Sequence, residues 1–115
     1  MIKQMPQAFE KMKKMKLLRI SRNCLTTIDY LSKCRYLKIL DVSHNQITSL
    51  DGLAGLQSLV ELKCNNNHIS SMKLIRSLPS LLELEISNNL LTSLDGLQHL
   101  PTLEILHAEH NNISK

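Results

Sequence analysis

The sequence predicts an α/β solenoid in which a short strand and a short helical return alternate along the chain. An Asn recurs every 22 residues, at positions 23, 45, 67, 89 and 111. Three complete rows of 22 residues, starting at Leu37, Leu59 and Leu81, align without a gap. The composition, 43% hydrophobic and 21% charged, is that of a folded, soluble protein. A period of this length indicates stacked repeats that share one extended core.

The first half of each row predicts a short strand that ends in a turn. Row positions four and six are apolar, as in Leu62 and Cys64, and this alternation is typical of a strand with one buried face. The recurring Asn at position nine follows the strand, where its amide can bond to backbone groups that the turn leaves unpaired. We therefore predict a structural ladder of Asn23, Asn45, Asn67, Asn89 and Asn111.

The second half of each row predicts a helical return. Row positions fourteen, seventeen and twenty are apolar, for example Leu50, Leu53 and Leu56. A spacing of three matches one stripe of a helix or a 3-10 turn packed on the core. The later rows repeat the stripe with Met72, Ile75 and Leu78, and then Leu94, Leu97 and Leu100. No row can bury its apolar face alone, so the rows must stack.

This frame divides the chain into a capping segment and five repeats. Residues 1–14 are expected to cap the first coil, because Pro6 suits a helix start and Phe9 and Met12 are spaced by three. The repeats 15–115 begin at positions 15, 37, 59, 81 and 103, and the last one lacks its helical half. An uncapped end exposes apolar surface, which predicts either self-association there or a further covering segment.

The pattern LxxLxLxxNxI followed by xxLxxLxxLxx, over residues 15–115, resembles the leucine-rich repeat. The row length resembles the subclass typified by a regulatory subunit of protein phosphatase 1. This resemblance implies a right-handed solenoid with a parallel sheet on its concave side and short helices or 3-10 turns on its convex side. It also implies a non-enzymatic scaffold that binds a protein, as in phosphatase-regulating, splicing, axonemal or cytoskeletal assemblies. We accordingly expect a cytoplasmic protein, with the cytoskeleton or a cilium as the narrower expectation.

We use the name concave face for the sheet surface formed by row positions three, five, seven and eight. Position five alternates in charge between neighbouring strands, which lie about 4.8 Å apart. It is either a solvated ladder of weak ion pairs or a charged stripe for a complementary protein. The candidate partner-binding residues are Arg19, Arg22, Asp41, His44, Glu61, Lys63, Asn66, Glu83, Glu85, Asn88 and His107.

The charge distribution supports one alternative function. The net charge is +4, yet residues 1–22 hold seven basic residues against the single acid Glu10. This basic end could assemble an RNA complex. Nucleic acid is not expected on the concave face, because Glu61, Glu83 and Glu85 make its centre acidic and the chain has one Phe, two Tyr and no Trp for stacking.

The sequence gives no reason to expect an enzyme, a cofactor, a metal site or a membrane span. It has no phosphate-binding loop or catalytic motif of the common families. His107, His110 and Glu109 offer metal-binding side chains, but neighbouring residues on a strand face opposite ways. Three cysteines without a CxxC pair are expected to be reduced, with Cys24 the most exposed. No apolar run approaches the roughly 18 residues of a membrane helix.

Overall fold

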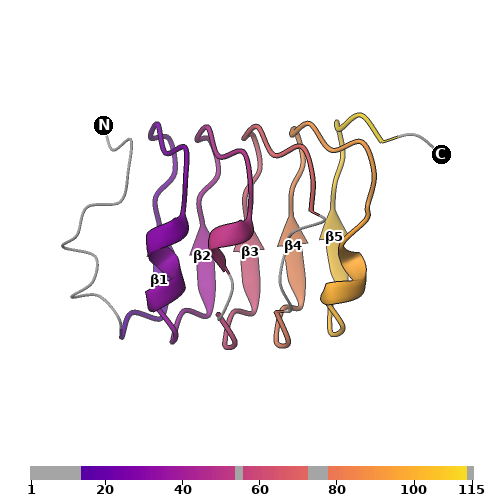
Figure 1. Ribbon diagram of the computed structural model, residues 1–115. Helices are drawn as coiled ribbons and strands as arrows, with labels where there is room; N and C mark the ends of the chain where they lie inside the picture. Colours follow the sequence, from indigo (N-terminus) through magenta and orange to yellow (C-terminus); the bar gives the residue numbers. More distant parts are fainter. Residues whose placement is uncertain (1–13, 54–55, 73–77, 114–115) are drawn as a thin grey trace.

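Five parallel strands stand side by side in chain order and form one sheet (Figure 1). The computed structural model describes residues 14–53, 56–72 and 78–113. The strands are β1 (Leu17–Arg19), β2 (Ile39–Asp41), β3 (Glu61–Lys63), β4 (Glu83–Glu85) and β5 (Ile105–His107). Each residue pairs with the one 22 positions later, as Leu18 does with Leu40 and Leu40 with Leu62. The predicted solenoid fold is thus confirmed.

The returns that connect the strands contain 3-10 helices: η2 (Asp29–Lys33), η3 (Asp51–Leu53) and η4 (Leu97–His99). Every helix in the described part of the chain is of this type. The apolar spacing of three explains the preference, because side chains three residues apart eclipse one another in a 3-10 helix. None of these helices is both long and apolar enough to span a bilayer. The expected capping segment lies outside the described residues apart from Lys14, and so does Ile75 of the third return.

The core runs continuously between the sheet and the returns. The middle residues of three strands, Leu40, Leu62 and Leu84, are 0% exposed. Cys64, at a position where the neighbouring rows hold larger residues, is also fully buried. Each row contributes the same inward positions, so successive coils cover one another's apolar edges.

The returns of the third and fourth coils approach closely at Gly96. This residue has φ +114°, and a Cβ atom added to it would lie 2.2 Å from the carbonyl oxygen of Met72. Only glycine fits this position without moving the backbone. Leu94, two residues earlier, is 36% exposed, whereas Leu50 at the same row position is 2% exposed. Leu94 is the more exposed because it belongs to the last return in the described part of the chain. Within that part, this return has a neighbouring return on one side.

Burial decreases at the β5 end of the described sheet. Leu106 and Ala108 are only partly buried, although Leu84 and Ile86 at the same row positions are 0% exposed. Ile105 is 46% exposed. Apolar surface is therefore present at the β5 edge of the described sheet, and what covers it stays a matter of prediction.

Candidate functional site: the concave face

The strand register arranges the outward side chains in rows across the sheet. Row position five places five side chains next to one another on the face opposite the core: Arg19, Asp41, Lys63, Glu85 and His107. Row position three forms a parallel line of Leu17, Ile39, Glu61, Glu83 and Ile105. Most of these side chains are half-buried or exposed while the residue between them is buried, so they constitute a solvent-facing surface.

The concave face has apolar ends and an acidic centre. Leu17 on β1 and Ile105 on β5 are 45% and 46% exposed. Between them, Glu61 pairs in register with Glu83, two residues from Glu85 on the same strand. A hydrogen bond with Glu85, partial burial and the charge of Glu61 raise the pKa of the Glu83 carboxyl. The neighbouring acids thus disfavour the ionised form of Glu83 relative to an isolated carboxyl.

The ladder asparagines connect each coil to the preceding coil by hydrogen bonds. The Oδ1 of Asn67 accepts the backbone N–H of Ile47 at 3.0 Å. Its Nδ2 donates to the carbonyls of Val42, Cys64 and Asn65, each at 3.1 Å. Asn45, Asn89 and Asn111 make the equivalent set of bonds, and the Nδ2 of Asn23 donates to the Ser21 carbonyl. These amides satisfy backbone groups, which accounts for the column without any ligand.

A second ladder, which the sequence pattern did not predict, lies at row position seven. The Oγ of Ser43 accepts the backbone N–H of Asn65 at 3.1 Å, and the Oδ1 of Asn65 accepts that of Ser87 at 2.9 Å. The Oγ of Ser87 in turn accepts the backbone N–H of Glu109 at 3.1 Å. The signal was available in the sequence, since every row carries a small or polar residue here. Position seven therefore fixes the rim of the concave face.

Row position eight is fixed by backbone conformation. The five residues there have φ between 57° and 60°: Arg22, His44, Asn66, Asn88 and His110. Asn and His are enriched among non-glycine residues in this left-handed region, which explains their recurrence before the ladder Asn. Four of the predicted partner-binding residues, Arg22, His44, Asn66 and Asn88, thus lie exposed on the turns that follow the strands. Their side chains extend the concave face beyond the sheet.

A short polar chain holds His107 at the β5 end of this face. The hydroxyl of Ser87 donates to the Glu109 carboxylate, whose Oε1 lies 3.6 Å from Nδ1 of His107. The bond from Ser87 and the proximity of His107 lower the pKa of Glu109. His107 and Glu109 lie two residues apart on one face, a spacing for which strand geometry brings side chains together. The alternation of strand side chains that counted against a metal site at His107, His110 and Glu109 concerns adjacent residues, and it does not apply to His107 and Glu109, which are two residues apart.

The three cysteines are not part of the concave face. All three are free thiols; Cys24 is half-buried, and Cys34 and Cys64 are buried. Burial raises the pKa of the Cys64 thiol, and the charges of Asp41 and Glu85 raise it further. Burial also raises the pKa of Cys34. Neither buried thiol can readily form the thiolate that a nucleophile or a metal ligand requires.

One known protein family matches this repeat. The family described as "Leucine Rich repeats (2 copies)" matches residues 13–55, 37–78 and 57–99. The chain belongs to the leucine-rich repeat family. A search of curated protein sequences finds no match. The leucine-rich repeat fold explains why the recurring Asn, the short strands and the 3-10 returns occur together.

Similar solved structures include proteins from two bacteria. Internalin C2 of Listeria monocytogenes is 28% identical, with a TM-score of 0.79, over 85% of this chain and 43% of that one. An internalin designated inlF from the same organism is 26% identical, with a TM-score of 0.85, over 93% and 32%. A leucine-rich repeat protein of Leptospira interrogans is 30% identical, with a TM-score of 0.85, over 95% and 29%. The chain spans less than half the length of each of them.

Proposed function

We propose that this leucine-rich repeat chain is a non-enzymatic scaffold that binds a protein partner on its concave face. Leucine-rich repeat proteins generally mediate protein–protein interactions. The observation that carries the proposal is the contrast between the two sides of each strand: one is a closed apolar core, and the other presents ordered charges to solvent. A rigid, regularly spaced surface loses little conformational entropy when a partner binds.

The partner chemistry is expected to be mixed. Exposed Leu17 and Ile105 offer apolar contacts at the ends of the concave face. The alternating charges of row position five would fix how a partner aligns along the face. Charges arranged in this way mainly determine which partner binds and how quickly. A cytoplasmic place in phosphatase-regulating, axonemal or cytoskeletal assemblies, as in the 22-residue class, is the narrower form of the proposal.

Affinity capture with matched charge reversals tests this function. Arg19→Glu and Lys63→Glu alter the concave face, whereas Gln57→Glu alters an exposed residue on the opposite, return side. We expect the first two variants to lose the same captured proteins and the third to retain them. Retention by both concave-face variants, with loss by Gln57→Glu, would place the binding surface on the convex side instead.

RNA-complex assembly through Lys11, Lys13, Lys14 and Lys16 is the competing hypothesis. Of these residues the structure describes Lys14 and Lys16, and both are exposed. Binding to phosphates weakens steeply as salt rises, because counterions are released. RNA binding that falls with salt and disappears when the four lysines are replaced by glutamine would favour it over the scaffold function.

A further inference from the structure

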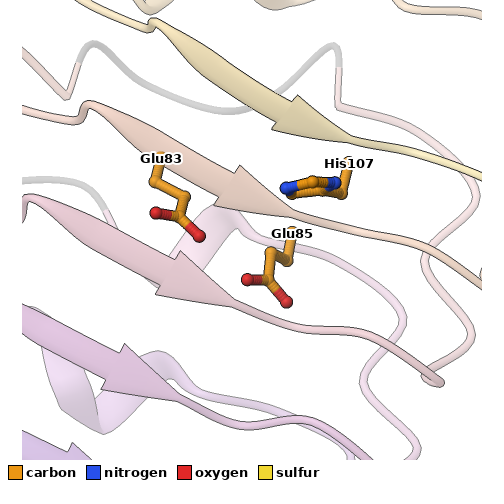
Figure 2. Close-up of side chains that lie close together, drawn as sticks. All are labelled: Glu83, Glu85 and His107. Atoms are coloured by element: carbon orange, nitrogen blue, oxygen red, sulfur yellow. The ribbon is translucent and has the colours of Figure 1, made fainter.

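We propose that Glu83, Glu85 and His107 form a binding site for a divalent transition-metal ion of the kind represented by Zn²⁺. The three residues offer one ligand atom each, and these atoms all lie within 4.8 Å of one another (Figure 2). Metal binding would be a further function of the chain, and it does not depend on the proposed binding of a protein partner.

The fold brings the three donors together from two strands. Glu83 and Glu85 are two residues apart on β4 and point to the same face, and His107 on β5 pairs in register with Glu85. Figure 2 shows the imidazole of His107 lying toward the two carboxylates. A tetrahedral Zn²⁺ ion bound about 2.0–2.2 Å from each donor holds its donor atoms about 3.3–3.6 Å apart. Small rotations of these solvent-facing side chains close that difference.

Neighbouring groups already orient two of the donors. The Oε1 of Glu109 lies 3.6 Å from Nδ1 of His107, so Nε2 is the nitrogen left for an ion. Histidines that bind metals commonly have a carboxylate at the second ring nitrogen, which fixes the tautomer. The Nδ2 of Asn65 donates to Oε1 of Glu85 at 2.9 Å and so holds this carboxylate in place. The Ser87 hydroxyl holds Glu109 in place.

The donor set and the charge indicate the class of ion. An imidazole favours zinc and other transition metals over Mg²⁺ or Ca²⁺, which prefer oxygen alone. Three protein ligands leave a coordination position for water. Lys63, in register with Glu85 on β3, is a positive charge that opposes the ion.

Isothermal titration of the untagged 115-residue chain with Zn²⁺, in the presence of excess Mg²⁺, tests the site. We expect one bound equivalent that Mg²⁺ does not displace. His107→Gln and Glu85→Gln should each lower the affinity at least about tenfold, and Glu109→Gln about tenfold, as for residues that orient a metal ligand. Lys63→Gln should raise the affinity.

Two controls separate this site from other Zn²⁺ ligands on the chain. His68→Gln removes an exposed histidine outside the cluster, and Cys24→Ser removes the most accessible thiol. Both should bind Zn²⁺ as the parent chain does. Far-UV circular dichroism checks that every variant is folded. Absence of binding, or wild-type affinity in folded Glu85→Gln and His107→Gln, would overturn the proposal, as would loss of binding in either control.

Discussion

Replacing Asn67 with Ala isolates the energetic role of the asparagine ladder. The variant loses four hydrogen bonds, but the consequences for the four backbone groups differ. The carbonyl of Val42 still accepts from Asn45 at 2.8 Å, and that of Cys64 still accepts from Asn89 at 3.0 Å. The carbonyl of Asn65 keeps the backbone N–H of His44 at 2.9 Å.

Among these four groups, the backbone N–H of Ile47 alone is left without its hydrogen-bond acceptor, and Ile47 is 0% exposed. A buried donor without an acceptor costs about 1–3 kcal/mol. We therefore expect Asn67→Ala to lower the free energy of unfolding by about that amount, far less than four independent hydrogen bonds would suggest.

Urea unfolding and amide hydrogen exchange measure the two parts of this prediction. The unfolding free energy reports the total loss, and exchange at the Ile47 amide should accelerate more than exchange at the amides of β4. Asn112→Ala removes an exposed asparagine next to a ladder position and should change stability by no more than about 0.5 kcal/mol. If Asn67→Ala also stays within that margin, or if the Ile47 amide remains protected, the ladder does not stabilise the coil as we infer.

Three further predictions concern the core, the returns and the thiols. Leu62→Ala should lower the free energy of unfolding in urea by about 2–5 kcal/mol because it opens a cavity in the fully buried core, whereas Lys63→Ala should lower it by at most about 0.5 kcal/mol. The opposite ranking would refute the assignment of inward and outward strand positions. Gly96→Ala should lower thermal stability by about 2 kcal/mol or more, because its φ is +114° and the added Cβ meets the Met72 backbone; an unchanged melting temperature would contradict this close approach. Native alkylation followed by mass spectrometry should label half-buried Cys24 far faster than Cys64, which is fully buried; equal rates in folded protein would contradict the burial.

The fold was predictable because its determinants repeat. One apolar residue such as Leu62 would be ambiguous, but Leu40, Leu62 and Leu84 at a constant spacing define one buried column. The same spacing predicted the register of the strands, since Arg19 pairs with Asp41 and Asp41 with Lys63. A regular solenoid converts a sequence period directly into lateral neighbours.

The candidate site was less predictable because it depends on backbone conformation and on contacts between side chains of neighbouring strands. The positive φ of Asn66 and His44 reflects a turn geometry that residue identity only favours. The cluster of Glu83, Glu85 and His107 joins two strands, so a search for ligands among chain neighbours of His107 could not find it. The 22-residue frame contains that contact, but the rotation of each side chain decides whether the donors converge.

The asparagine ladder also determines how such a chain can grow or shrink during evolution. Each ladder residue bonds its own coil and the coil 22 residues earlier, and it does so in the same way at Asn45, Asn67 and Asn89. Removing or duplicating one whole row therefore restores every bond across the new junction. The surface charges, by contrast, do change. Loss of residues 59–80 would place Asp41 beside Glu85, and two negative charges would then adjoin in row position five, where charges of opposite sign now alternate. Gain or loss of a whole row can thus change the number of coils with little effect on the asparagine ladder while it changes which charges adjoin on the concave face.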